Sequence, residues 1–167
     1  MITAIVAVAD NNLIGSNNDL PWPRISEDMN WFKSLTTGNV VVMGRNTWES
    51  LGDYKPLPNR INVVVSSDEA DGADLTITEN TLVNIKNLET EYPEKEIFII
   101  GGARLYETTE SIIDKVQMTR IRNYYEGDTF LNTDLLLQHS VVERSETMVT
   151  KKDRLSIEFN TYRKLKR

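Results

Sequence analysis

The sequence contains no cysteine, and His139 is the only histidine among its 167 residues. Disulfide bonds and catalysis by a thiol are therefore excluded, and a zinc site built from histidine and cysteine ligands is not available. We expect no bound metal. The absence of cysteine is compatible with a reducing compartment.

The sequence also lacks any apolar run long enough to span a bilayer, and its start, MITAIVAVADNN, has neither the basic segment nor the apolar length of a signal peptide. The formal net charge is −6 at pH 7, which argues against a general nucleic-acid binder because phosphates repel an acidic surface. We therefore expect a soluble, cytoplasmic monomer without a membrane or nucleic-acid partner.

The composition is that of a globular domain, with 40% hydrophobic and 26% charged residues, and the length allows one domain with a substantial core. Apolar runs typical of strands buried on both faces alternate with helix-like segments. We predict strands at residues 2–8, 39–44, 61–67, 96–102 and 115–121. Helices are predicted at about 25–35, 45–52, 79–92 and 103–114.

After Tyr124 the pattern changes, because alternating segments flank a turn at residues 151–153, which predicts an antiparallel hairpin. Strands that alternate with helices indicate a mostly parallel sheet covered on both faces. We therefore predict a single α/β domain over residues 1–167. Its central sheet has about eight strands and an antiparallel C-terminal edge hairpin, and about four helices flank it.

The residues that leave each strand are candidate binding residues, since ligands of such sheets bind beyond the carboxyl ends of the strands. Two of these corners, Gly44-Arg45 and Gly101–Arg104, combine glycine and arginine with the start of a helix, and a third is Ser66-Ser67. Free helix N–H groups, glycine and the arginine fork all suit phosphate, so the corners together predict a ligand with several phosphates. For one corner alone, a tight turn with a solvated arginine is an equally good interpretation. The GxGxxG fingerprint of an ordinary dinucleotide-binding fold is absent.

Asp28 lies on or beside the apolar face of the first predicted helix, which is formed by Ile25, Met29, Phe32 and Leu35. In one interpretation it complements the helix dipole and faces water, although Glu27 already fills that role. In the other it lies at the floor of an apolar cleft, where no neighbouring lysine or arginine can pair with it. Its partner would then be a ligand with two parallel N–H donors. Ser26 is predicted to cap this helix.

Seven short segments repeat the order and spacing of one enzyme family across nearly the whole chain. They are Ile14-Gly15 with LPW at 20–22, Asp28 with Trp31-Phe32, VMGRNTWES at 42–50, PLPNR at 56–60, VVVSS at 63–67, IIGGARLY at 99–106 and EGDTF at 126–130. Each motif is weak alone, but together they are highly specific. On these residues the sequence resembles dihydrofolate reductases.

The resemblance implies NADPH-dependent reduction of 7,8-dihydrofolate to 5,6,7,8-tetrahydrofolate by hydride transfer to C6, in support of one-carbon metabolism and thymidylate synthesis. Asp28 would accept hydrogen bonds from the N3–H and 2-amino groups of the pterin, and Thr119 would orient it. Arg60 would bind the carboxylate of the glutamate tail. The walls of the substrate site would be Ile5, Ala7, Phe32, Leu51, Leu57 and Ile100.

The catalytic residues implied by the resemblance are Asp28, Leu20, Trp22 and Tyr106. The loop from Gly15 to Trp22 would close over the nicotinamide and exclude water, and Tyr106 would stand against the nicotinamide ring. A water ordered by this closure would protonate N5 while Asp28 tunes the ring electrostatically. Residues 101 and 102 would be joined by a cis peptide. The residues implied to bind NADPH are Ala7, Ile14, Gly15, Ser16, Asn18, Gly44, Arg45, Asn46, Thr47, Val65, Ser66, Ser67, Ile100, Gly101, Gly102, Ala103, Arg104, Leu105 and Tyr106.

Three features depart from the family pattern. Asn46 stands where many members carry a basic residue or histidine. The loop after Ser67 is acidic and offers no clear second cation for the 2′-phosphate, which leaves the strength of the NADPH preference open. The segment GDYK at 52–55 is longer than the short bacterial form.

Two other functional classes stay open. The first is a reductase of this fold that acts on another pterin or a pyrimidine. Asp28 and Arg60 together argue against it, because only a folate-like ligand needs both a ring anchor and a remote carboxylate clamp. The second is a non-catalytic binding module, which we would expect to have lost Asp28, the Trp22 loop or the Gly-Gly turn.

Overall fold

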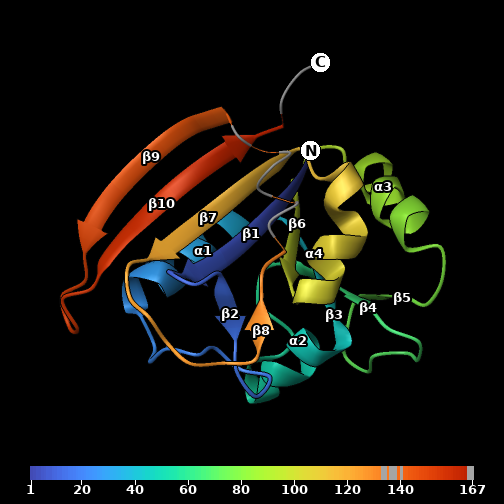
Figure 1. The fold of residues 1–167 in the computed structure, drawn as a ribbon. Coiled ribbons are helices and arrows are strands. Elements are labelled where there is room, and N and C mark those ends of the chain that lie inside the picture. Colours follow the sequence, from blue (N-terminus) through green and yellow to red (C-terminus); the bar gives the residue numbers. More distant parts are fainter. Residues whose placement is uncertain (133–134, 136–138, 140, 165–167) are drawn as a thin grey trace.

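An eight-stranded sheet forms the centre of the molecule (Figure 1). The computed structural model describes residues 1–132, 135, 139 and 141–164. Across the sheet the strands are β5 (Leu75–Ile77), β4 (Ile61–Val65), β3 (Val40–Gly44), β6 (Ile97–Gly101), β1 (Ile2–Ala9), β7 (Lys115–Ile121), β10 (Ser156–Arg163) and β9 (Val141–Val149). The strands from β5 to β7 are parallel, whereas β10 is antiparallel to β7 and β9. The predicted fold class is confirmed.

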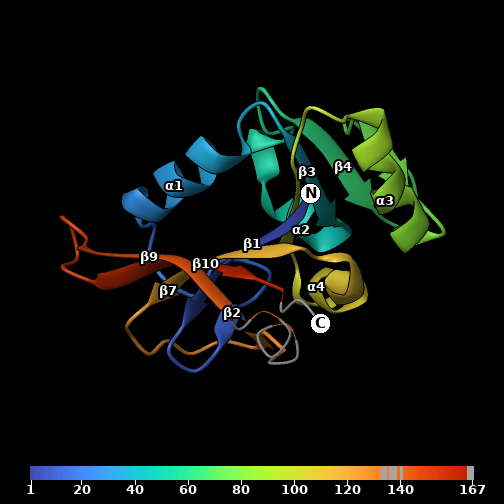
Figure 2. The same ribbon diagram turned by 90° about the horizontal axis from the view of Figure 1, so that it is seen from above.

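Helices cover both faces of this sheet. They are α1 (Ser26–Thr36), α2 (Arg45–Ser50), α3 (Thr81–Glu91) and α4 (Ala103–Thr109), with 3₁₀ turns at Gly52–Tyr54 and Glu110–Ile112. Because successive strand side chains point to opposite faces, Val42 packs in the cluster of α3 and α4, while Val41 and Met43 pack in the cluster of α1 and α2. Figure 2 shows α1 and α4 on opposite sides of β1 and β7.

The first helix differs from its prediction in two details. Ile25, in extended conformation, occupies the capping position, and the Ser26 hydroxyl donates to Glu27 Oε1 at 3.1 Å, so the predicted Ser26 cap is wrong. Met29 is 39% exposed and does not face the sheet. Its predicted place on the inward stripe is taken by Asp28, because positions 25, 28, 32 and 35 lie on one side of an α-helix.

A second, two-stranded sheet lies outside the segments predicted as strands or helices. In it β2 (Leu13–Gly15) pairs antiparallel with β8 (Thr129–Phe130), as Figure 1 shows. These strands, like β5, are too short to show a sequence period. The small sheet joins the chain after β1 to the chain after β7.

Gly127 is packed where no side chain fits. A Cβ built there would lie 2.5 Å from the Gly15 carbonyl oxygen and 2.7 Å from Leu13 Cδ1. The glycine therefore lets the segment before β8 approach β2 closely.

We expect Gly127→Ala to lower the free energy of unfolding by about 1–3 kcal/mol, the usual effect of overpacking a close contact. Chemical denaturation monitored by tryptophan fluorescence measures this change. The control is Glu126→Ala, at the exposed neighbouring residue, which should leave the free energy of unfolding nearly unchanged. Equal stability of Gly127→Ala and wild type would show that the two segments can separate freely.

Candidate active site

Five of the six predicted substrate-wall residues lie in one hydrophobic cluster on the α1/α2 face of the sheet. They are Ile5, Phe32, Leu51, Leu57 and Ile100. Ile5 is buried, but the other four keep part of their surface exposed. The sixth residue, Ala7, packs in the adjacent cluster that contains Trp22. The structure thus gathers the predicted walls along a partly exposed apolar edge.

Asp28 is half-buried on the inward side of α1. The hydroxyl of Thr119, a buried residue of β7, donates a hydrogen bond to its carboxylate. Burial raises the pKa of Asp28, and the bond from Thr119 offsets only part of that rise. Within the described part of the chain no lysine or arginine pairs with this carboxylate. The geometry therefore favours the cleft interpretation over a solvated first-turn acid.

The C-terminal hairpin holds the start of α1 in place. The backbone N–H of Lys151 donates to Glu27 Oε2 at 2.8 Å, and this bond is the main reason that the pKa of Glu27 is lowered. One turn further along, the rings of Trp31 and Phe159 lie 4.5 Å apart. Phe159 is also the strand partner of Thr119. The hairpin therefore contacts α1 on both sides of Asp28.

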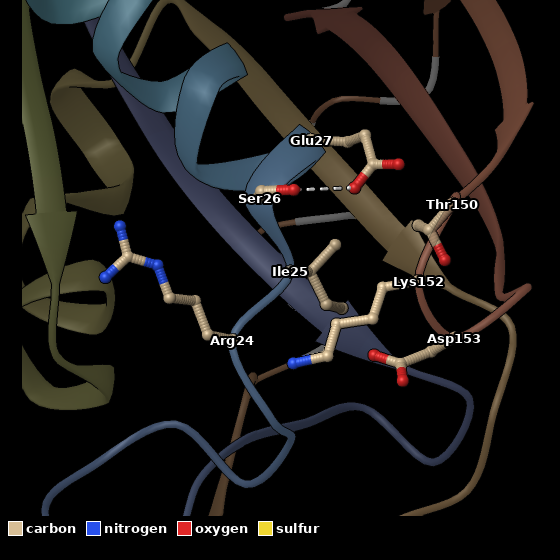
Figure 3. A pocket seen from close by; sticks show the side chains of 7 residues that line it. All are labelled: Arg24, Ile25, Ser26, Glu27, Thr150, Lys152 and Asp153. Carbon is tan, nitrogen blue, oxygen red and sulfur yellow. Dashed lines mark hydrogen bonds between the residues drawn. The ribbon is translucent and has the colours of Figure 1, made fainter.

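A cavity of about 130 Å³ lies between this hairpin and the start of α1 (Figure 3). Figure 3 shows the side chains of Lys152 and Asp153 on the hairpin side, while the side chain of Arg24 extends away from them. The residues that line the cavity are Arg24, Ile25, Ser26, Glu27, Thr150, Lys152 and Asp153. None of them belongs to the predicted site, so this cavity is distinct from the apolar edge beside Asp28.

Arg60 stands at the far end of the apolar edge. Its Nη1 donates to Thr36 Oγ1 at 3.1 Å, its Nε donates to the Pro58 carbonyl at 2.9 Å, and its guanidinium lies 5.9 Å from the Phe32 ring centroid. Partial burial lowers the pKa of Arg60, and among the described residues no carboxylate pairs with it. It also borders an open cavity of about 260 Å³. Its charge is therefore available to an anion.

The loop before α1 is tied to the rest of the site at two points. Asn17 and Asn18 take left-handed conformations in a tight turn, which asparagine tolerates well. The backbone N–H of Asn17 donates to Asp128 Oδ2 at 3.2 Å, and Asn18 Nδ2 donates to the carbonyl of Asn46 at 3.2 Å. Leu20 is 50% exposed on this loop. Trp22 is buried and packs near Tyr125, with ring centroids 5.9 Å apart, so it anchors the loop.

The corners after β3 and β6 lie against each other. A Cβ at Gly44 would lie 3.8 Å from both the Gly101 oxygen and the Gly102 nitrogen, and Thr47 Oγ1 would be 3.4 Å from a Cβ at Gly101. The peptide between Gly101 and Gly102 is cis, as the resemblance implied. Tyr106 is buried behind this corner and donates to the Ile5 carbonyl at 2.6 Å, and burial raises its pKa.

The corner after β4 is joined to the start of α2 by Arg45. Its Nη1 donates to the Glu69 carbonyl at 3.2 Å, and its Nε pairs with Glu49 Oε1 at 3.1 Å. Ser66 is half-buried and its hydroxyl accepts the Asp68 N–H at 3.3 Å, while Ser67 is exposed. The predicted phosphate corners therefore occupy neighbouring positions along one edge of the sheet.

Comparison with known proteins agrees with this arrangement. The family model described as dihydrofolate reductase matches residues 1–164. The chain belongs to the dihydrofolate reductase family. The dihydrofolate reductase of Bacillus subtilis is 41% identical over 131 residues, which cover 77% of this chain and 73% of that protein. Dihydrofolate reductase type 3 of Salmonella typhimurium is 37% identical over 165 residues and 96% of both chains.

A solved dihydrofolate reductase has the same fold. The enzyme of Enterococcus faecalis, complexed with NADP(H) and RAB-propyl, superposes with a TM-score of 0.82 at 25% identity, over 99% of this chain and 97% of that one. The predicted family, activity and cofactor, those of an NADPH-dependent dihydrofolate reductase, are confirmed at the level of the family.

Not every residue assigned from the family resemblance lies at the surface of the site. Leu105 is 6% exposed and Tyr106 is 4% exposed, and both side chains pack in the core where α4 meets the sheet. Arg104, by contrast, is exposed on that helix. Ala103, Val65, Ile14 and Ser16 are partly buried.

No role was predicted from the sequence for two polar residues, Asp128 and Asn62. Asp128 lies inside the matching segment EGDTF, but no role was assigned to it. Asn62 interrupts the apolar run of β4 and is fully buried, with its side chain bonded to the N–H and carbonyl of Leu57 and to the carbonyl of Arg60, at 2.9, 2.9 and 3.1 Å. A polar residue in an otherwise apolar strand was the available signal.

The structure also bears on metals and membranes. Within the described ranges no three His, Cys, Asp or Glu side chains are grouped to hold a metal ion. His139 is buried, and its two ring nitrogens each lie 2.9 Å from a carbonyl oxygen, those of Leu135 and Ile113. No helix in the described part of the chain is long and apolar enough to cross a membrane.

We expect Asn62→Leu to lower the free energy of unfolding by about 1–3 kcal/mol, because the segment before Arg60 loses its hydrogen-bond partners. The KM for dihydrofolate should rise more than kcat falls, since Arg60 is no longer held in direction. Denaturant unfolding and steady-state kinetics measure both effects. Asn84→Leu on α3, which removes a single bond to the Glu79 carbonyl, is the control. An unchanged free energy of unfolding for Asn62→Leu would show that these hydrogen bonds do not stabilise the fold.

Proposed function

We propose that this chain reduces 7,8-dihydrofolate to tetrahydrofolate with NADPH, and that Asp28 anchors the pterin ring. The observation that carries the assignment is a half-buried carboxylate at an apolar edge, with a threonine hydroxyl beside it and, among the residues that the structure describes, no cation paired with it. A carboxylate in such surroundings lacks hydrogen-bond donors. The N3–H and 2-amino groups of a pterin supply two parallel donors, and charge-assisted bonds of this kind are strong.

The remaining substrate contacts follow from the shape of the site. Phe32, Leu51, Leu57 and Ile100 would enclose the pterin and benzoyl rings. Arg60, at the far end of the same edge, would bind the carboxylate of the glutamate tail in a bidentate pair. Its bonds to Thr36 and Pro58 hold the fork in a preset direction, which reduces the entropy lost on binding.

The residues present fit NADPH. The Gly44 and Gly101-Gly102 corners adjoin each other without side chains between them, and Arg45 and Ser67 stand at the neighbouring corners. Arg45 and Ser67 would hold the 2′-phosphate, and Thr47 with residues 102–104 would hold the pyrophosphate. When bound, NADPH supplies the hydride that C6 of the substrate receives.

The chain itself orients the substrate and controls water. Thr119 would orient the Asp28 carboxylate toward the edge of the pterin ring. The loop of Leu20, fastened by Asp128 and anchored by Trp22, would cover the nicotinamide and exclude bulk water. A water admitted at this closure donates the proton that N5 requires, and the negative charge of Asp28 favours the protonated ring.

The setting of the enzyme is also proposed. We propose that the enzyme is a monomer. The lack of cysteine is compatible with the reducing cytoplasm.

Asp28→Asn should retain the fold and lose most activity near neutral pH, with a residual rate that rises at lower pH, where the substrate protonates in solution. The folded-state pKa of Asp28 is raised, so wild-type stability falls as pH rises from the ordinary carboxyl pKa through the raised value. The asparagine variant lacks that fall and should be at least as stable at pH 7. Nicotinamide absorbance and denaturant unfolding measure the two effects. Near-wild-type turnover at pH 7 would remove Asp28 from the mechanism.

Arg60→Ala should mainly raise the KM for dihydrofolate, because the tail contact is similar in the ground and transition states. A loss of one charge-assisted pair corresponds to about 1.5–3 kcal/mol, or roughly 10- to 100-fold. A tail-less dihydropterin should be a poor substrate of wild type and should not respond to the substitution. The test compares kcat/KM for both substrates in both proteins. If both substrates slow by the same factor, the tail assignment fails, and a reductase of another pterin becomes the better interpretation.

A further inference from the structure

Glu49 is shared by two cations beside the corner after β3. Its Oε1 lies 3.1 Å from Arg45 Nε, and its Oε2 lies 3.0 Å from Lys55 Nζ. Arg45 and Glu49 are one helical turn apart on α2, whereas Lys55 follows the 3₁₀ turn Gly52–Tyr54. The three side chains form one surface network, which we call the Glu49 bridge.

Lys55 is the better held of the two cations. Its ammonium lies 5.4 Å from the ring centroid of Trp48, a residue that is 1% exposed. Its side chain is 28% exposed, compared with 42% for Arg45. Lys55 also contributes more than Arg45 to lowering the pKa of Glu49. The carboxylate is thus shared between two cations at similar distances, of which Lys55 is the less exposed.

This bridge matters because the surroundings of Arg45 are acidic. The loop after Ser67 carries Asp68, Glu69 and Asp71, and Arg45 already donates to the Glu69 carbonyl. A carboxylate on Arg45 competes with a phosphate for the same guanidinium fork. Paired with Glu49 alone, Arg45 would present no net charge to an arriving phosphate. With Lys55 in the network, one positive charge remains.

We propose that Lys55 and Glu49 are positioning residues that set the preference for NADPH over NADH by controlling how free Arg45 is to bind the 2′-phosphate. Lys55 binds one oxygen of the Glu49 carboxylate while the other oxygen contacts the Arg45 fork, so Lys55 weakens the competition of Glu49 with the phosphate for Arg45. This inference rests on the proposed function, in which Arg45 binds the 2′-phosphate. The cation that offsets Glu49 comes from the GDYK segment, which departs from the family pattern.

The test measures KM for NADPH and for NADH with dihydrofolate as the second substrate. Lys55→Met should raise KM for NADPH roughly two- to five-fold, as expected for a solvent-exposed ion-pair network, and leave KM for NADH unchanged. Glu49→Gln should lower KM for NADPH by a similar factor. Both shifts should shrink at high salt. An unchanged NADPH-to-NADH ratio in both variants would overturn the inference.

A double-variant cycle shows whether Lys55 acts through Glu49. In the Glu49→Gln background, Lys55→Met should have little further effect, because the competitor is already gone. An equal effect in both backgrounds would mean that Lys55 attracts the phosphate directly, which would overturn the proposed bridge. Lys86→Met on α3 removes the same charge from another lysine–glutamate pair, Lys86 and Glu89 at 2.8 Å, and should leave the ratio unchanged.

Arg45→Ala separates this inference from the proposed function. It should weaken NADPH far more than NADH. If both cofactors weaken equally, Arg45 does not bind the 2′-phosphate, and both the cofactor assignment and the bridge fail. If Arg45→Ala behaves as expected while Lys55→Met and Glu49→Gln have no effect, only the bridge fails.

Discussion

The site depends on one constraint, which is that a carboxylate on the inward side of α1 must be held without a cation. Asp28 takes a position that would otherwise carry an apolar residue, and Thr119 is its bonded neighbour. Burial makes its charged form costly in the free protein, as the raised pKa shows. In the proposed function, a ligand that brings two N–H donors would relieve that cost, so the unfavourable placement of Asp28 would select for the pterin ring.

Two separate parts of the chain keep α1 and its neighbouring loop in place. On one side the hairpin of β9 and β10 contacts Glu27 through the Lys151 backbone. On the other, the small sheet of β2 and β8 brings Asp128 to the loop, and Asn18 reaches the start of α2. Backbone groups take part in each of these contacts. The side chains that these contacts require are therefore those of Glu27 and Asp128, which accept, and of Asn18, which donates.

The parallel strands explain why the cofactor residues come together although they are far apart in the chain. In a parallel sheet the carboxyl ends of β3, β4 and β6 fall at one edge, and the glycines at 44 and 101 let two of these corners meet. The alternation of side chains places Phe32, Leu51, Leu57 and Ile100 on the α1/α2 face, where they form the partly exposed apolar edge that we propose receives the pterin.

The sequence by itself determined the long strands, the helices and the mostly parallel sheet, because buried strands and amphipathic helices have a clear hydrophobic periodicity. The family motifs then identified Asp28, Arg60 and the glycine-containing corners as candidate site residues. Tertiary structure alone decided the facts that depend on distant neighbours. Short strands such as β2 have no measurable period. Asp28, rather than Met29, faces inward only once α1 lies on the sheet, and Leu105 is buried only because its own helix, α4, packs against the sheet. The Glu49 bridge likewise exists because a turn after α2 brings Lys55 back over Trp48, a proximity that no local pattern encodes.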